Sequence, residues 1–313
     1  MTTVLITGGA GFIGRWLVRH ALNAGAVVVV YDNLSIGSLE NLMEMEGNFA
    51  FYRGDIRDQS RLSQVLRKHA VERVFHLAAL HYIPYCESHP QETFEVNLVG
   101  TLAVLEAMRA ASVQRLVFAS TGALYPPLDI PLTEETPLEP QDIYGMTKLH
   151  CEQAIQYYQK RYGIEATIVR LFNTYGPYET NPHLLPHIIQ TLKQGVREIP
   201  LGNLKPKRDY VYVTDVAEGF WRLGESPATV GVYNLGTGVE HSVEEVVATL
   251  SELLRMPIQI VQDPTRVRPV DKLHQRADLE RLRAALRWTP STSLTQGLRH
   301  WLAFEGLLGQ RCG

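Results

Sequence analysis

The feature that most constrains the fold is a glycine-rich turn near the N-terminus, TGGAGFIG at residues 7–14. It follows the apolar run at residues 4–6 and opens a helical pattern over about residues 12–23. Glycines permit a tight turn and let a pyrophosphate approach the backbone, and a helix N-terminus attracts the phosphate charge. The glycine spacing alone is weak, because a turn without a ligand is the alternative. The strand–turn–helix context favours a dinucleotide-binding unit.

A single acidic residue indicates which dinucleotide binds. The second apolar run, residues 26–31, ends in Asp32. An acid about twenty residues beyond the glycines can accept hydrogen bonds from the adenosine ribose hydroxyls. The next three residues include no lysine or arginine, so a 2′-phosphate would meet a carboxylate with no cation beside it. The sequence therefore predicts NAD rather than NADP.

Apolar runs alternate with helical patterns through the first half of the chain. This alternation predicts an α/β fold, a Rossmann-type doubly wound parallel sheet. Ligands bind at the carboxyl ends of the strands in such sheets, where we expect Asp32, Asp55, Ala78 and Ser120. Asp55 could instead be the N-cap of the next helix. The expected strands are residues 49–52, 71–77 and 115–118, and the expected helices are residues 59–69, 90–111 and 143–162.

The regular alternation ends after residue 175, which suggests two domains. We expect residues 1–175 to form the NAD-binding domain, with residues 210–237 returning to it. Residues 176–209 and 238–313 are expected to form a smaller, substrate-binding domain over the edge of the sheet.

Tyr144 and Lys148 are four residues apart at the start of a predicted helix and share one of its faces. A free phenol has a pKa near 10, too high for a base at neutral pH, and a nearby ammonium favours the phenolate. Lowering this pKa by about 3 units requires about 4 kcal/mol, which Lys148 and a nicotinamide cation could supply together. An exposed helical Tyr and Lys are the alternative. Their place after a dinucleotide motif and the strand-end pair Ser120-Thr121 favours a catalytic base.

Together these motifs resemble the extended short-chain dehydrogenase/reductase family, and in particular its NAD-dependent sugar-nucleotide epimerase and dehydratase branch. The resemblance covers nearly the whole chain. It continues through VRLFNTYGP at 169–177, RDYVYVTDV at 208–216, YNLG at 233–236 and WTP at 288–290.

The resemblance implies a role for each catalytic residue. Thr121 would hydrogen-bond the reacting hydroxyl, Tyr144 would be the base, and Lys148 would hold the nicotinamide ribose. The residues expected to bind the cofactor are Gly8, Gly11, Phe12, Ile13, Gly14, Asp32, Asn33, Asp55, Ile56, Leu77, Ala78, Ala79, Asn97, Tyr144 and Lys148.

The same resemblance implies a site for a nucleotide sugar. Asn173 would contact the sugar diphosphate, and Arg208 and Arg268 would pair with it. The loop at residues 81–86 should face the sugar, with His81 among the contacts. Cys86 or His81 could add an acid or base and so imply 3,5-epimerisation or dehydration, although the alternative is that both only shape the pocket wall. The residues expected to bind the substrate are His81, Thr121, Asn173, Arg208 and Arg268.

Gly122 and Ala123 narrow the expected reaction. Dehydratases and decarboxylases of this family carry an acid directly after the strand-end threonine, and this sequence has none there. The departure favours C4 epimerisation of a UDP-hexose of glucose, N-acetylglucosamine or glucuronate type through a 4-keto intermediate. A dehydratase, a 3,5-epimerase, an NADP-dependent keto-sugar reductase and a non-catalytic dinucleotide-binding sensor are the alternatives.

Composition limits the partners. The net charge is −3 with no basic run, so nucleic acid is not expected, and no apolar segment reaches the length of a membrane span. Cys86, Cys151 and Cys312 fit neither a disulfide framework nor a metal spacing, which favours the cytoplasm.

His183 and His187 lie four residues apart on a possible helix. No third ligand is evident beside them, so we expect no metal. Members of the resembled family pair two helices, here at residues 90–111 and 143–162, across a two-fold axis. We therefore expect a homodimer.

Overall fold

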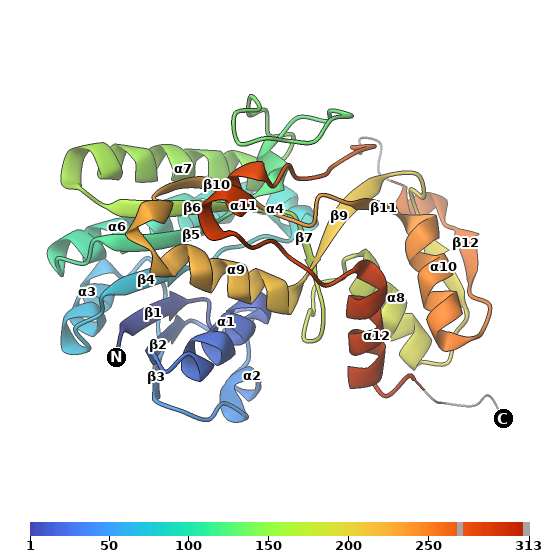
Figure 1. The fold of residues 1–313 in the computed structure, drawn as a ribbon, viewed down its shortest axis with the longest axis horizontal. Helices are drawn as coiled ribbons and strands as arrows, with labels where there is room; N and C mark the ends of the chain where they lie inside the picture. Colours follow the sequence, from blue (N-terminus) through green and yellow to red (C-terminus); the bar gives the residue numbers. More distant parts are fainter. Residues whose placement is uncertain (268–271, 309–313) are drawn as a thin grey trace.

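The computed structural model describes residues 1–267 and 272–308, and a seven-stranded sheet lies at its centre (Figure 1). The strand order is β10-β6-β5-β4-β1-β2-β3, and every neighbouring pair is parallel. The order reverses between β1 and β4, where a doubly wound sheet binds its ligand. The predicted Rossmann-type fold is confirmed. The strands are β1 (Thr3–Thr7), β2 (Val27–Asp32), β3 (Phe49–Arg53), β4 (Arg73–His76), β5 (Arg115–Thr121), β6 (Glu165–Leu171) and β10 (Gly231–Leu235).

Helices cover both faces of this sheet, as Figure 1 shows. Successive residues of β2 enter opposite cores, because side chains alternate along a strand. Val28 and Val30 pack with α1 (Phe12–Asn23) and α9 (Val213–Glu225), whereas Val29 packs with the helices of the other face. The helices on that second face are α3 (Gln59–Lys68), α6 (Gly100–Ala110) and α7 (Ile143–Tyr162).

The helix expected at residues 90–111 exists, but it is not uniform. It consists of α5 (Pro90–Phe94), the π-helical turn η1 (Glu95–Val99) and α6. Such π turns interrupt α-helices rarely and often occur at functional sites. The π turn directs Asn97 into the protein interior, where this residue is 1% exposed.

A smaller unit lies beyond the carboxyl ends of the large sheet (Figure 1). It has its own core, which includes Leu185, Val246 and Trp301. Its strands form a sheet in the order β11-β9-β7 and a parallel pair, β12-β8. Its elements are β7 (Asn173–Tyr175), α8 (Leu184–Lys193), β8 (Glu198–Leu201), β9 (Lys207–Tyr212), β11 (Glu240–Ser242), α10 (Val243–Leu254), β12 (Gln259–Gln262) and α12 (Leu294–Phe304).

Two later segments return to the large sheet. β10 pairs with β6 at its edge, and α11 (Glu280–Leu286) packs on β10, with Leu282 in the core of the first face. The division into two domains at the residues given above stays a prediction. The remaining short elements are α2 (Glu40–Met43), α4 (Ile83–Ser88), η2 (Gly122–Leu124), η3 (Pro227–Thr229) and η4 (Pro264–Arg266). Among the described residues, no helix combines the length and apolar character of a membrane span.

Candidate active site

The glycine turn brings three segments together at the switch point of the sheet. Gly8 has φ +70°, and a Cβ there would lie 2.8 Å from the backbone nitrogen of Ala78, at the end of β4. A Cβ on Gly14 would collide with the Gly8 carbonyl oxygen. Gly11 is the N-cap of α1, so the first N–H groups of this helix, including those of Phe12 and Ile13, face the same turn. The cradle is thus built for close approach of an anion to the backbone.

Asp32 lies beside this cradle and is 7% exposed. Its carboxylate accepts hydrogen bonds from the backbone N–H groups of Ala10, at 3.0 Å, and Leu34, at 2.8 Å. Burial raises the pKa of Asp32, and the two hydrogen bonds partly oppose this change. The next residue, Asn33, is exposed. The acid is therefore fixed at the end of β2, directly beside the glycine turn.

Asp55 follows β3 and is hydrogen-bonded to Arg57. Its carboxylate accepts hydrogen bonds from the backbone and guanidinium of Arg57, which hold its pKa below the usual range. The N-cap of α3 is Asp58, whose side chain accepts a hydrogen bond from the backbone of Arg61. The alternative interpretation of Asp55 as this N-cap is wrong. Ile56, beside Asp55, is buried at 5% exposure.

Thr121, Tyr144 and Lys148 meet at the carboxyl end of β5. Asp142 caps the N-terminus of α7 and so places Tyr144 in its first turn. The Lys148 ammonium lies 6.0 Å from the centroid of the Tyr144 ring and donates a hydrogen bond to the Ala119 carbonyl at 2.8 Å. Thr121 hydrogen-bonds the Tyr144 phenol. The four-residue spacing thus brings a hydroxyl, a phenol and an ammonium to one place.

The pKa values at this site are controlled mainly by burial. Burial raises the pKa of Tyr144, and the hydrogen bond with Thr121 only partly offsets this. Burial also lowers the pKa of Lys148 to about 8, against the charges of Cys151 and Glu152. The pKa of the phenol is therefore raised even with Lys148 beside it, because desolvation is the largest cause.

A buried histidine links the ends of β1 and β4 to the helix behind them. His76 Nδ1 lies 2.7 Å from the Thr7 hydroxyl, and its Nε2 lies 3.1 Å from the Thr101 hydroxyl. Burial, followed by the charge of Lys148, lowers the pKa of His76 to about 3. The imidazole is therefore neutral, and it fixes the strand ends that carry Ala78 and its neighbours Leu77 and Ala79.

Asn97, in the π turn, holds the loop that follows β4. Its side-chain oxygen accepts a hydrogen bond from the Leu80 N–H at 2.8 Å, and its nitrogen donates to the Leu80 carbonyl and the Thr147 hydroxyl, both at 2.9 Å. Asn97 is thus a positioning residue that joins this loop to α7. Its expected contact with the cofactor stays a prediction.

The loop after β4 carries His81 and Cys86. His81 Nε2 lies 3.1 Å from the side-chain nitrogen of Asn181, and burial, more than the charge of Lys148, lowers the pKa of His81 to about 4. Cys86 is completely buried, and burial raises the pKa of its thiol. A buried thiol with a raised pKa is a poor base, so the structure argues against the acid–base role considered for Cys86.

The expected diphosphate contacts lie where β9 approaches the site. Arg208, on β9, donates hydrogen bonds to two carbonyls, including that of Lys272 at 2.6 Å. Asn173 begins β7, pairs in register with Tyr210 of β9, and is exposed. Arg268 lies outside the described residues. Sequence reasoning missed Lys272, which no motif marks, although its ammonium donates to the carbonyl of Ala123, within η2, and to that of Tyr125, directly after it.

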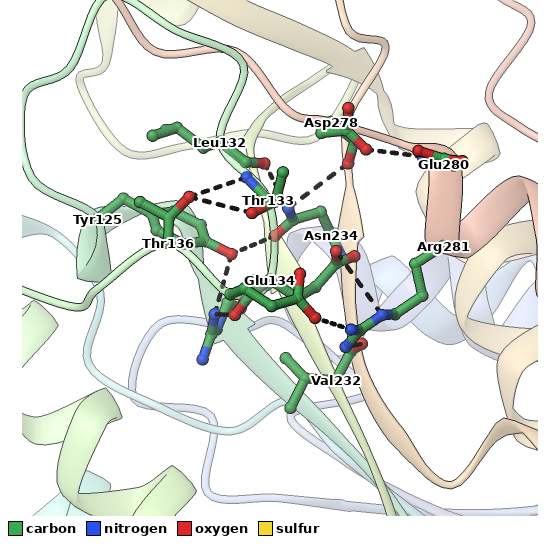
Figure 2. A network of polar contacts seen from close by, with 12 residues as sticks. Tyr125, Leu132, Thr133, Glu134, Thr136, Val232, Asn234, Asp278, Glu280 and Arg281 are labelled. Carbon is green, nitrogen blue, oxygen red and sulfur yellow. Dashed lines mark hydrogen bonds and ion pairs between the residues drawn. The ribbon is translucent and has the colours of Figure 1, made fainter.

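The loop between Thr121 and Tyr144 is anchored to the edge strand β10, as Figure 2 shows. The Tyr125 hydroxyl donates to the Asn234 side-chain oxygen at 2.7 Å. The Asn234 amide nitrogen donates to the Leu132 carbonyl at 2.7 Å, and its backbone N–H donates to Glu134 at 2.8 Å. Through Asn234, the motif at residues 233–236 therefore holds the loop between Thr121 and Tyr144 against β10.

Known proteins are similar to this chain in sequence and in fold. A family model described as GDP-mannose 4,6 dehydratase matches residues 5–301. The chain belongs to the NAD-dependent sugar-nucleotide epimerase and dehydratase branch of the extended short-chain dehydrogenase/reductase family. The resemblance inferred from the motifs is confirmed.

Several characterised members of this family are similar over most of their length. A UDP-glucose 4-epimerase from Streptomyces lividans is 35% identical, over 92% of this chain and 91% of that protein. The crystal structure of a UDP-glucose 4-epimerase from Thermotoga maritima with UDP-glucose has a TM-score of 0.89 and 30% identity, covering 97% of this chain and 98% of that one. The Thermus thermophilus UDP-glucose 4-epimerase in complex with NAD has a TM-score of 0.88 and 31% identity, covering 99% of this chain and all of that one (100%).

Gly122 and Ala123 form the turn η2 directly after Thr121. The Gly122 carbonyl accepts a hydrogen bond from the Gln275 side chain at 3.0 Å, and a Cβ on Gly122 would lie 3.3 Å from the same nitrogen. The position where other members of the family carry an acid is thus occupied by a closely packed, uncharged turn.

Proposed function

We propose that this protein is an NAD-dependent nucleotide-sugar 4-epimerase acting on a UDP-hexose of glucose, N-acetylglucosamine or glucuronate type. The observation that carries the proposal is the meeting of Thr121, Tyr144 and Lys148 at the end of β5, with no carboxylate at positions 122 and 123. Relatives named UDP-glucose 4-epimerase at 30–35% identity support the same reaction.

The residues around the glycine turn fit an NAD molecule. A Cβ at Gly8 would meet the backbone of Ala78, and one at Gly14 would meet the backbone of Gly8, so these glycines let the turn pack tightly under the N-terminus of α1. The N–H groups of that terminus suit a pyrophosphate, and Asp32 offers an acceptor to the adenosine ribose. Ile56 would border the adenine. Asp55, beside it, is hydrogen-bonded to Arg57. Bound NAD supplies the hydride acceptor. The further residues proposed to line it are Gly11, Phe12, Ile13, Asn33, Leu77, Ala78, Ala79 and Asn97.

The chain's own residues carry the proton. Tyr144 takes the proton of the sugar C4 hydroxyl, and Thr121 orients that hydroxyl through its hydrogen bond to the phenol. Lys148 holds the nicotinamide ribose and contributes a positive charge. Since burial raises the pKa of Tyr144 in the protein alone, the phenol needs a second positive charge to act as a base at neutral pH. The oxidised nicotinamide ring would supply that charge.

The sugar must rotate between the two half-reactions so that hydride returns to its opposite face. Arg208, with Arg268, would hold the diphosphate as a pivot, since a guanidinium pairs well with phosphate oxygens. Asn173 and His81 complete the proposed contacts. The lack of an acid at positions 122 and 123 leaves nothing beside the reacting carbons to assist loss of water.

We further propose a cytoplasmic homodimer. Exposed apolar side chains mark the helices expected at the interface: Val99 in η1 is 50% exposed, and Met146, Tyr157 and Tyr162 of α7 are 41%, 58% and 43% exposed. A two-fold axis would bury this patch on both copies. The two cysteines among the described residues, Cys86 and Cys151, are free, which fits a reducing compartment.

The test is incubation with UDP-glucose, UDP-N-acetylglucosamine and UDP-glucuronate in deuterated water, followed by NMR and mass spectrometry. We expect the C4 epimer of at least one substrate, with unchanged mass and no deuterium at C3 or C5. Tyr144→Phe is the inactive control. A product lighter by water would establish a dehydratase. Deuterium at C3 or C5 would establish a 3,5-epimerase. Stoichiometric consumption of reduced cofactor would establish a reductase. Bound NAD without any turnover would establish a sensor.

A further inference from the structure

A second group of polar side chains lies apart from the Tyr144–Lys148 pair. His81 comes from the loop after β4, and Glu179 and His183 come from the segment between β7 and α8. One ligand atom of each lies within 4.8 Å of those of the other two. The reason for expecting no metal, the lack of a third ligand near His183 and His187, therefore does not hold. His187 itself is elsewhere, with its Nε2 3.3 Å from the Pro200 carbonyl.

The lone pair of His81 faces the Asn181 amide nitrogen, which also donates to Glu179, so a metal shared by His81 and Glu179 would displace this amide. The imidazole hydrogen-bonds the Ala79 backbone, and its Nε2 lies 3.1 Å from the Asn181 side-chain nitrogen. An amide nitrogen can only donate, so Nε2 is the acceptor and the proton lies on the other ring nitrogen. Histidines that bind metals typically donate this second N–H to a carbonyl or carboxylate.

Glu179 supplies the negative charge. It is 8% exposed, and its carboxylate accepts hydrogen bonds from the backbone and side chain of Asn181, at 2.9 and 3.2 Å. No lysine or arginine in the described ranges forms an ion pair with it. Removing a carboxylate from water is costly unless a cation accompanies it. His81 is neutral, so a bound metal is the cation that would accompany this carboxylate in the proposed site.

The ring of His183 completes the set. Its centroid lies 6.1 Å from that of His81 and 5.5 Å from that of Tyr82. His183 is also the N-cap of α8, directly before Leu184, and its carbonyl accepts a hydrogen bond from the His187 N–H at 3.0 Å, which fixes its backbone. Two imidazoles and one carboxylate are the protein ligands of open, four-coordinate zinc sites.

We propose that His81, Glu179 and His183 bind a divalent cation of the zinc class, with one coordination position left open. Zinc bonds of about 2.0–2.2 Å to all three residues would hold their ligand atoms around one ion. Binding would therefore clamp the loop after β4 to the segment before α8. These segments border the proposed sugar position, but the site is inferred from its own geometry and does not depend on the reaction.

The test is calorimetric titration of zinc chloride into the chelator-treated, full-length protein with its bound NAD, together with thermal unfolding. We expect one zinc ion per chain and a higher unfolding temperature when zinc is present. Glu179→Gln, which keeps the side chain's shape, and His81→Asn should each weaken zinc binding at least tenfold and abolish the thermal shift. His187→Ala, close in sequence but outside the cluster, should bind zinc like the unmodified protein.

A second cluster provides a further control. Asp129, Glu240 and His274 also have ligand atoms within 4.8 Å of one another, but Asp129 is exposed, and His274 already bonds Glu240 at 2.7 Å. Zinc binding that survives Glu179→Gln but is lost in Asp129→Asn/His274→Ala would overturn the proposal, as would the lack of any zinc-dependent thermal shift. Epimerase assays of the same variants without zinc would report on the proposed reaction separately.

Discussion

Glu152 and Arg170 form an ion pair inside the protein, with Glu152 Oε2 and Arg170 Nη2 2.8 Å apart and the two side chains 2% and 5% exposed. Glu152 also accepts a hydrogen bond from the Ser120 hydroxyl, and Arg170 donates one to the Tyr125 hydroxyl at 2.9 Å. The pair thus joins α7 and β6 to both ends of the segment that contains Thr121. The pair therefore holds Thr121 in place through the buried residues on either side of it.

Arg170→Met should destabilise the protein by about 3–5 kcal/mol, because it leaves the Glu152 carboxylate buried without its partner. The measurement is the free energy of unfolding in urea. The double variant Glu152→Leu/Arg170→Met removes both charges and should recover much of the loss. If the single and double variants are equally unstable, the cost comes from lost packing and not from the unpaired charge.

Tyr144→Phe should reduce turnover by about 10²–10⁴-fold, the typical contribution of a general acid–base group. Only the phenolic oxygen is lost, so the amount of NAD that copurifies should stay near that of the unmodified protein. Turnover is measured by the NMR assay and NAD content after denaturation. Normal turnover in this variant would show that another group moves the proton.

Lys148 should make stability depend on pH. Its pKa is lowered from 10.5 to about 8, a difference of about 2.5, or about 3 kcal/mol. Between pH 8 and 10.5 the unfolded chain binds more protons than the folded protein, so stability from this group rises with pH. Below pH 8 the cost of burying the ammonium is fully present. The free energy of unfolding of the unmodified protein should be lower than that of Lys148→Met at pH 7, and the difference should shrink as the pH rises to 10. Parallel pH profiles of the two unfolding free energies would contradict this.

Asp32→Ala should weaken NAD binding and narrow the difference between NAD and NADP. The change removes an acceptor for the ribose hydroxyls and the negative charge that repels a 2′-phosphate. Binding is measured by titration of the cofactor-stripped protein with each dinucleotide. Glu46→Ala, which removes an exposed carboxylate outside the proposed cofactor contacts, is the control and should leave the preference for NAD unchanged.

Light scattering at micromolar concentration should give the mass of a dimer. Met146→Lys/Tyr157→Lys places two charges on the exposed apolar surface of α7 and should shift the protein toward the monomer. Val261→Lys, on an exposed residue of β12, is the control and should remain dimeric. A monomer in the unmodified protein, or a dimer unaffected by the α7 changes, would contradict the proposed interface.

Much of the fold and the local chemistry could be predicted from contiguous sequence. The alternation of apolar runs and helical patterns gave the parallel sheet, and the glycine turn and Asp32 lie together at its switch point as expected. The four-residue spacing of Tyr144 and Lys148 fixes them on one face of α7. These features depend on backbone geometry within one or two elements, which the order of residues specifies directly.

Other features were decided only by tertiary packing, because they join residues far apart in the chain. Burial raises the pKa of Tyr144 even with Lys148 nearby, and the size of this effect depends on how completely the folded chain excludes water. The π turn at Glu95–Val99 places the Asn97 side chain against Leu80 and Thr147, which come from other parts of the chain. His81 reaches Glu179 and His183 across about a hundred residues because the loop after β4 meets the segment before α8. No spacing rule records such a meeting, since it exists only once the two parts of the chain have packed together.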